Sequence, residues 1–240
     1  MSFLPWREEY NLPSFRRELL CEFVGVFFLL FITLGCVVFN NDGIISPAHA
    51  VRLSLINGGT TACLVYSLSS VSAIFNPAVC LALALTKRIS PFKALACSAV
   101  QCVAAACGAA LVRAMTPALF EAAGGGANQL SPSASLAEGL AVEFACTFVL
   151  VMVVMAANDE AAARRSPHLP TLAPLVVGLA VVSANFVAIP VTACSINPAR
   201  TWGVALVSGN WDSHWIFWFG PCLGAAAATQ VYHRLGGEGA

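Results

Sequence analysis

The stretch SINPART, Ser195–Thr201, places an arginine directly after an Asn-Pro-Ala triplet. The same triplet stands earlier in the chain, within FNPAV at residues 75–79. Asparagine is a strong helix N-cap, and proline is favoured at the first helical position because its missing N–H is not needed there. Each triplet therefore predicts the start of a short helix, one from Asn76 to about Leu85 and one from Asn197 to about Leu206.

The two triplets belong to an internal duplication. Their asparagines are 121 residues apart, and so are Glu22 and Glu143, which stand in the similar stretches CEFVGVFFLLF and VEFACTFVLVM. Two separate anchors with one offset predict two homologous halves, at about 18–115 and 139–235, within a single domain that occupies residues 1–240. With three spans in each half, the second half is inverted, and sites in such repeats lie at the midplane between the halves.

The composition places the chain in a membrane. Of its 240 residues 58% are hydrophobic and 10% are charged, and its mean hydropathy is +0.79. Soluble domains carry about 25% charged residues. Six segments approach the roughly 20 apolar residues of a transmembrane helix: Leu19–Phe39, Leu53–Leu68, Ala94–Leu111, Leu140–Ala157, Leu172–Ile189 and Trp215–Tyr232. We expect an all-α polytopic protein, with six transmembrane helices and two re-entrant half-helices in an inverted three-span repeat.

The basic residues predict the orientation in the bilayer. Nine of the twelve lie in the N-terminus, the second and fourth connections and the C-terminal tail, and three lie toward the other side. The positive-inside rule therefore predicts that both termini are cytoplasmic. Net charge is zero and no basic patch is present in the sequence, so no nucleic-acid partner is expected. The expected location is the plasma membrane rather than an intracellular one.

Three stretches, FNPAV, TACSINPAR and HWIFWFGP, resemble the aquaporins of the major intrinsic protein family. The resemblance extends from about Glu18 to Tyr232. It implies six tilted helices and two half-helices around a narrow pore, usually one pore per subunit of a homotetramer. The implied activity is passive, osmotically driven and proton-excluding water flow, with no cofactor.

The resemblance also assigns pore residues. Those of the two triplets are Asn76, Pro77, Ala78, Asn197, Pro198 and Ala199, and those of the outer filter are Ile56, Asn185, Cys194 and Arg200. Two residues, Ile56 and Asn57, are candidates for the filter position on the second span. Ile56 is assigned by counting twenty residues back from Asn76 without a gap, and a gap would place Asn57 there instead. An alternative for Arg200 is an ion pair with a buried glutamate.

The substrate is open between water and a larger solute. Glycerol-conducting members typically follow the arginine with aspartate, and here Thr201 stands there. Ile and Asn in place of the usual filter phenylalanine and histidine remove ring bulk, which favours a wider pore. We expect water flow, and a facilitator of glycerol, urea or peroxide is the alternative. Ile74 replaces a common histidine before the first triplet, which leaves the inner vestibule's hydrogen bonding open.

Glu22 and Glu143 have two possible roles. An ionisable residue inside a membrane span marks function by default, so a proton-coupled transporter is one interpretation. The favoured one is structural, since re-entrant backbone has to be satisfied by protein groups rather than by lipid.

Other classes of function find less support. No H-E-x-x-H or G-x-S-x-G motif indicates an enzyme, and the four histidines show no metal-binding spacing. A structural junction protein of the same family, with negligible flow, stays open. Nine of the ten cysteines are expected to be small buried hydrophobes, with Cys194 facing the pore. AAGGGANQLSPSAS, residues 122–135, is expected to be a flexible extracellular connection.

Overall fold

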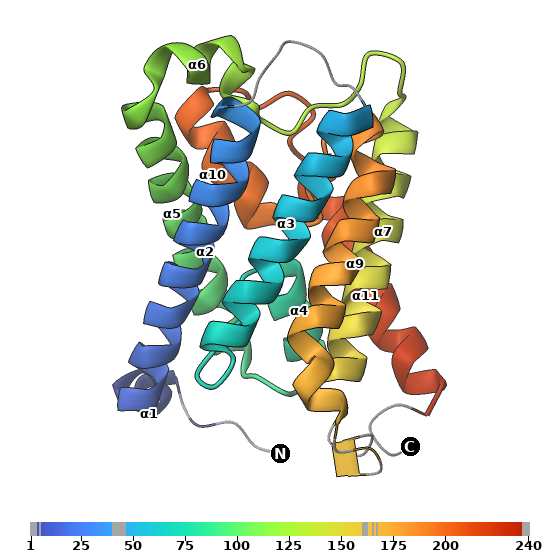
Figure 1. The fold of residues 1–240 in the computed structure, drawn as a ribbon. Coiled ribbons are helices and arrows are strands. Elements are labelled where there is room, and N and C mark those ends of the chain that lie inside the picture. Colours follow the sequence, from blue (N-terminus) through green and yellow to red (C-terminus); the bar gives the residue numbers. More distant parts are fainter. Residues whose placement is uncertain are drawn as a thin grey trace.

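The protein is described as a computed structural model that covers residues 4, 6–39, 47–159, 163–164, 166 and 168–236. This part of the chain is helical and contains no strand. Its helices, in chain order (Figure 1), are α1 (Trp6–Asn11), α2 (Pro13–Phe39), α3 (Pro47–Leu68), α4 (Pro77–Leu85), α5 (Pro91–Met115), α6 (Pro117–Ala122), the 3-10 turn η1 (Gly124–Gly126), α7 (Leu136–Ala157), α9 (Leu169–Thr192), α10 (Pro198–Ser208) and α11 (Ile216–Arg234).

Six long helices form the bundle, and they carry the six predicted spans. By length and composition, α2, α5, α7 and α9 are apolar enough to cross a membrane. The other two, α3 with 22 residues and α11 with 19, run beside them. Polar and small residues in α3, from Asn57 to Thr61, explain its lower hydropathy. The all-helical architecture expected from the sequence is confirmed.

The two short helices lie inside the bundle, as the triplets predict. Helix α4 has 9 residues and α10 has 11, and both begin with the proline of a triplet. In Figure 1, α10 occupies the upper half of the bundle and α4 the lower half. Their N-termini therefore approach each other near the middle.

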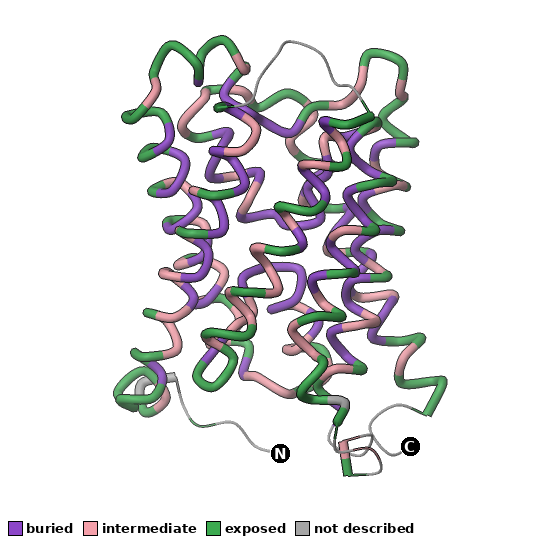
Figure 2. Tube along the Cα trace, in the orientation of Figure 1, coloured by how far each residue is buried: buried purple, intermediate pink, exposed green. Residues whose placement is uncertain are grey.

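Packing follows the duplication. Helix α2 packs against α5 in the first half, α7 packs against α11 in the second, and α3 contacts α9 across the halves. In Figure 2 the buried positions gather where the helices face one another and around the half-helices, whereas the outer faces are exposed. Helix α1 and the C-terminal end of α11 lie at the same end of the bundle (Figure 1).

Two glycines bring α3 and α9 into close contact. A Cβ built on Gly58 would lie 2.4 Å from the carbonyl oxygen of Gly178, and one built on Gly178 would lie 2.6 Å from that of Gly58. Small residues at such crossings let helix backbones approach closely in membranes. This contact places Asn57, the neighbour of Gly58, next to the pore-side face of α9.

Candidate functional site

The first half-helix is capped by Asn76, which also reaches the second half of the chain. Its Oδ1 accepts a hydrogen bond from the backbone N–H of Ala78 at 2.9 Å. Its Nδ2 donates to the carbonyl oxygen of Ile196 at 2.8 Å. One side chain therefore begins α4 and fixes the backbone that leads into α10.

The second half-helix repeats this arrangement. Asn197 Oδ1 accepts from the backbone N–H groups of Ala199 at 3.1 Å and Arg200 at 3.4 Å. Its Nδ2 donates to the carbonyl oxygen of Phe75 at 2.8 Å. The positive ends of two helix dipoles, each on the order of half a charge, therefore meet at the centre of the molecule.

The residue before each asparagine has a left-handed backbone. Phe75 has φ 55° and Ile196 has φ 47°, and both are bulky residues for which this conformation is costly. Such backbone strain persists only where the surrounding contacts hold the residue in this conformation. In both halves a buried glutamate supplies that constraint.

Glu22 binds the lead-in to α4. Its Oε1 accepts from the hydroxyl of Ser72 at 2.5 Å and the backbone N–H of Ile74 at 2.8 Å. Its Oε2 accepts from the backbone N–H of Phe75 and from Gln101 Nε2, both at 2.7 Å. The carboxylate, which is fully buried, is thus saturated by donors from the re-entrant segment and from α5.

Glu143 binds the lead-in to α10 in the same way. Its Oε1 accepts from the hydroxyl of Thr192 at 2.7 Å and the backbone N–H of Ser195 at 2.8 Å. Its Oε2 accepts from the backbone N–H of Ile196 at 2.7 Å. Neither Glu143 nor Glu22 lines either of two cavities, of about 480 Å³ and 320 Å³, that lie inside the bundle. These contacts favour the structural role over a proton relay.

Two cavities inside the bundle share three residues of their walls, and the place where these residues lie is called the constriction. The inner one, of about 480 Å³, includes Asn76, Asn197 and Ile74 in its wall. The outer one, of about 320 Å³, opens toward the α5–α7 connection. Of the described residues, three line both cavities: Asn57, Asn185 and Arg200. These three residues therefore lie at the boundary between the two cavities.

Arg200 is held at this place by the α5–α7 connection. Its Nη1 donates to Asn128 Oδ1, and its Nη2 donates to the carbonyl oxygen of Gly126 at 3.4 Å. Asn128 Oδ1 also accepts from the hydroxyl of Thr201 at 2.7 Å, and its Nδ2 donates to the carbonyl oxygen of Ala193 at 3.1 Å. The arginine therefore pairs with neutral acceptors, and the contacts do not favour an ion pair with a buried glutamate.

The expectation of a flexible connection at residues 122–135 is wrong for its stretch 125–128, which packs inside the molecule. Gly125, Gly126, Ala127 and Asn128 are buried, and the three consecutive glycines from Gly124 all have positive φ. A Cβ on Gly125 would lie 2.4 Å from the Cβ of Ser208. The connection therefore folds down into the outer mouth. The run GGGAN at residues 124–128 was the available signal, because glycine adopts positive φ without steric cost and permits close approach of the backbone.

Asn57, not Ile56, is the constriction residue of α3. Asn57 Nδ2 donates to Asn185 Oδ1 at 2.6 Å. Ile56 is 36% exposed and lines neither cavity, so its assignment to the filter is wrong. Consecutive helical residues point about 100° apart, so an ungapped count that is one residue out turns the side chain away from the pore.

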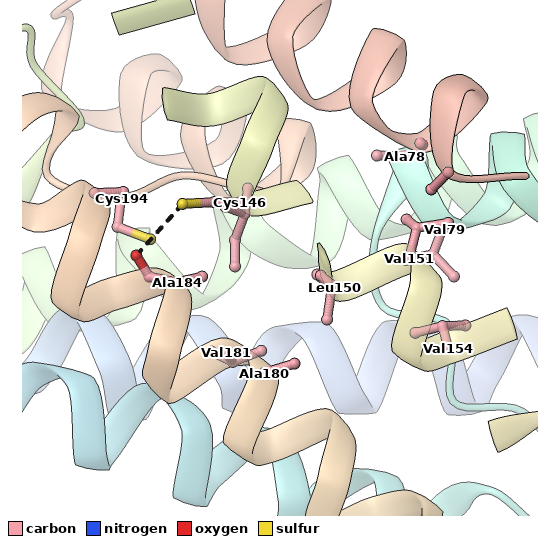
Figure 3. Packing of buried hydrophobic residues seen from close by; sticks show 14 of the residues in the cluster. Ala78, Val79, Cys146, Leu150, Val151, Val154, Ala180, Val181, Ala184 and Cys194 are labelled. Carbon is pink, nitrogen blue, oxygen red and sulfur yellow. Dashed lines mark hydrogen bonds between the residues drawn. The ribbon is translucent and has the colours of Figure 1, made fainter. Parts of the chain in front are cut away.

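Cys194 lines the inner cavity near the constriction, although it is largely buried. Figure 3 shows its side chain pointing toward Cys146 of α7 and Ala184 of α9, within one buried cluster. The Cys146 thiol donates to the carbonyl oxygen of Ala184 at 3.7 Å. A second thiol, that of Cys146, therefore stands beside Cys194 but does not line the inner cavity.

Comparison with known proteins shows the family of this chain. The family model described as "Major intrinsic protein" matches residues 9–232. This chain belongs to the major intrinsic protein family. The resemblance stated from the sequence motifs is thereby confirmed.

Relatives within the family are similar over most of their length. "Aquaporin PIP2-4" of Oryza sativa subsp. japonica is 40% identical over 95% of this chain and 84% of its own length. "Aquaporin PIP1-6" of Zea mays is 40% identical over 92% of this chain and 77% of its own. The solved aquaglyceroporin of Plasmodium falciparum shares the fold, with a TM-score of 0.80 at 23% identity, over 92% of this chain and 96% of that chain.

Proposed function

We propose that this member of the major intrinsic protein family is a passive, osmotically driven water channel. The observation that carries the proposal is the pair of cavities joined at Asn57, Asn185 and Arg200, with both capping asparagines at the inner side. A path of this kind needs no moving part and no energy source. Family membership implies a channel rather than an enzyme, and relatives carry the name aquaporin.

Proton exclusion follows from the electrostatics of the same path. The N-termini of α4 and α10 direct their positive dipole ends at the centre, and Arg200 adds a full charge at the constriction. Pores use an arginine or the positive ends of half-helices to exclude protons and other cations. We therefore propose that water passes while hydronium does not.

The orientation in the membrane and the assembly follow from the ends and the outer faces of the bundle. Helix α1 and the C-terminal end of α11 lie at the same end of the bundle. The distribution of basic residues favours the cytoplasm for that end. Exposed apolar side chains, such as Leu95 and Val103 of α5, provide outer faces for lipid or for neighbouring copies. We propose a homotetramer in the plasma membrane, with one pore in each subunit formed by both halves together.

Reconstitution tests the proposal. Purified protein in liposomes, subjected to an osmotic step in a stopped-flow instrument, is expected to shrink the vesicles much faster than protein-free liposomes. The activation energy is expected to be low, because water crosses a formed path rather than dissolving in lipid. Shrinkage indistinguishable from that of protein-free liposomes overturns the proposal and favours a structural member of the family.

A further inference from the structure

We propose that Cys194 and Cys146 form a redox modification site, in which hydrogen peroxide oxidises Cys194 and Cys146 resolves the product as a disulfide. Such a site lies beyond the proposed water conduction, because its chemistry involves two thiols and a peroxide rather than flow. The two thiols differ in one respect: Cys194 lines the inner cavity and Cys146 does not.

Cys194 is the thiol that a molecule in the inner cavity meets. All ten cysteines lie in the described part of the chain, and of these Cys194 alone contributes to the wall of either cavity. The residue is 4% exposed, so a reagent reaches it from the cavity and not from the outer faces of the bundle. Hydrogen peroxide, which differs from water by one oxygen atom, is small enough to enter a cavity of about 480 Å³.

Helix α7 holds Cys146 and the glutamate that binds the segment of Cys194. Glu143 accepts from the backbone N–H of Ser195, the residue after Cys194, at 2.8 Å. Cys146 follows Glu143 by three residues, and side chains at that spacing are neighbours on a helix surface. The contact that fixes Ser195 therefore also brings Cys194 to Cys146, and Figure 3 shows the Cys194 side chain pointing toward Cys146.

Cys146 is shielded from the cavities while it lies beside the pore thiol. It is 6% exposed and belongs to the same buried cluster as Cys194. Its thiol donates to the carbonyl oxygen of Ala184 at 3.7 Å, which holds the sulfur in place. Peroxide in the cavity therefore meets Cys194 first, and Cys146 is in position to react with the oxidised sulfur. Redox-active cysteines are often paired with a resolving cysteine in this way.

The fold does not require a thiol at either position. The repeat offset of 121 residues places Gly25 at the position of Cys146. It places Ala73 at the position of Cys194. The first half forms the equivalent lead-in to its half-helix, bound by Glu22. Since glycine and alanine serve there, the two thiols are a chemical feature of the second half and not a demand of its packing.

The reaction balances with hydrogen peroxide as the oxidant. The Cys194 sulfur attacks one oxygen of the peroxide, the O–O bond breaks, and the thiol proton leaves with the other oxygen as water. The product is a sulfenic acid on Cys194. The Cys146 sulfur then attacks the Cys194 sulfur, the S–O bond breaks, and the hydroxyl group leaves with the Cys146 thiol proton as a second water. Two thiols are oxidised to one disulfide by two electrons, and the peroxide is reduced to two waters.

Resolution by Cys146 keeps a charge out of the path. A sulfenic acid that is not resolved is oxidised further to a sulfinic acid, which thiols do not reduce. A sulfinate on Cys194 would add two oxygens and a negative charge to the wall of the inner cavity, which also contains Asn76, Asn197 and Arg200. The disulfide is uncharged, and thiol–disulfide exchange returns it to two thiols.

The test exposes the purified full-length protein to hydrogen peroxide and then to dithiothreitol. Cys146→Ser keeps the pore thiol without its partner, and Cys194→Ser keeps the partner alone. Cys107→Ser is the matched control, because Cys107 is exposed and lines neither of the two cavities. Peptide mass spectrometry of the protein in detergent identifies the oxidised residues, and stopped-flow light scattering of proteoliposomes measures water flow.

The variants are expected to differ in what peroxide leaves behind. Wild-type protein and Cys107→Ser yield a disulfide-linked pair of peptides that contains Cys146 and Cys194, and dithiothreitol restores their full water flow. Cys146→Ser accumulates sulfinic acid at Cys194, and its water flow falls at least threefold without recovery in dithiothreitol. Cys194→Ser yields no such linked pair and keeps its water flow.

Several results would overturn the inference. A Cys194 that stays a thiol in peroxide contradicts the site itself. Oxidised Cys194 without the linked pair in wild-type protein, or full recovery of Cys146→Ser in dithiothreitol, contradicts the resolving role. The peptide data do not depend on flow, so a lack of water flow in the untreated protein overturns the water channel and not this site.

Wild-type protein alone still decides if Cys146→Ser does not fold. The disulfide leaves no free thiol in the wall of the inner cavity, so peroxide-treated wild-type protein is expected to resist block by mercury until dithiothreitol reduces it. A mercury block that is the same before and after peroxide treatment contradicts the disulfide.

Discussion

Asn76 and Asn197 each donate a hydrogen bond to the carbonyl oxygen that immediately precedes the other asparagine. Both bonds, Asn76 Nδ2 to Ile196 O and Asn197 Nδ2 to Phe75 O, are 2.8 Å long. Each half-helix therefore depends for its first turn on the backbone of the other half. The duplication produces a centre that neither half can form alone.

This reciprocity predicts coupled effects of mutation. Replacing Asn76 by leucine, or Asn197 by leucine, removes both a helix cap and a bond across the halves. Each single change is expected to lower stability by about 1–3 kcal/mol, because buried donors and acceptors lose their partners. The double variant is expected to lose less than the sum, since the two sites share one network. Thermal unfolding of the purified protein in detergent measures this, and strict additivity contradicts the coupling.

Glu143 is expected to act through structure and not through proton transfer. In Glu143→Gln one carboxylate oxygen becomes an NH2 group that faces the donors of Thr192, Ser195 or Ile196. The melting temperature and the water flow are expected to fall together, and no pH gradient is expected to drive uptake in either protein.

A matched control is Glu138→Gln, at an exposed capping box on the same helix α7. It is expected to leave both readouts close to wild type. Gradient-driven uptake that disappears in Glu143→Gln at unchanged melting temperature supports the proton-relay alternative instead.

The local part of this fold is predictable from the sequence, because caps are local signals. The triplets predict helices beginning at Asn76 and Asn197, and the structure begins α4 and α10 at the next residue in each case. The repeat and the family resemblance together favour a structural role for the two buried glutamates, and the contacts of both carboxylates with the re-entrant backbone agree with that role.

What could not be predicted depends on contacts between distant segments. The contact of Gly58 with Gly178, which is 120 residues away in the chain, sets the side of α3 that faces the pore. The choice between Ile56 and Asn57 therefore required the structure. Asn128 was missed because its role exists only once the glycine run folds against Arg200.

Asn128 is expected to control leakage through the constriction. Asn128→Ala removes an acceptor of Arg200 and of Thr201, and a donor to the backbone at Ala193. The guanidinium then loses its main anchor, so we expect proton or solute leakage to rise several-fold while water flow persists. A pH-sensitive dye inside the vesicles detects the protons. Ser133→Ala, at an exposed position of the same connection, is the control, and equal leakage in both variants contradicts the role.

Cys194 is expected to be the site of mercurial inhibition. It lines the inner cavity next to the constriction, so a mercury adduct on its sulfur would narrow the path. Mercury is expected to block water flow in the wild-type protein and not in Cys194→Ser. Cys146→Ser tests the thiol behind it, and this variant is expected to stay sensitive. Undiminished block in Cys194→Ser, with loss of block in Cys146→Ser, assigns the site to the second thiol.

Gly58 and Gly59 provide a matched pair for the contact between α3 and α9. A Cβ on Gly58 would lie 2.3 Å from Val182 Cγ2 and 2.4 Å from the Gly178 carbonyl oxygen, whereas one on Gly59 meets nothing within 4 Å. Gly59→Ala is expected to be neutral or to stabilise the protein by up to about 1 kcal/mol, because alanine is the better helix former. Gly58→Ala is expected to push the helices apart and lengthen the bond from Asn57 to Asn185. The melting temperature of Gly58→Ala is expected to fall and its water flow is expected to change. Gly59→Ala is expected to keep the water flow of the wild-type protein, with a melting temperature that is no lower. Equal behaviour of the two variants in the same assay contradicts the assignment of this crossing as the contact that positions the constriction.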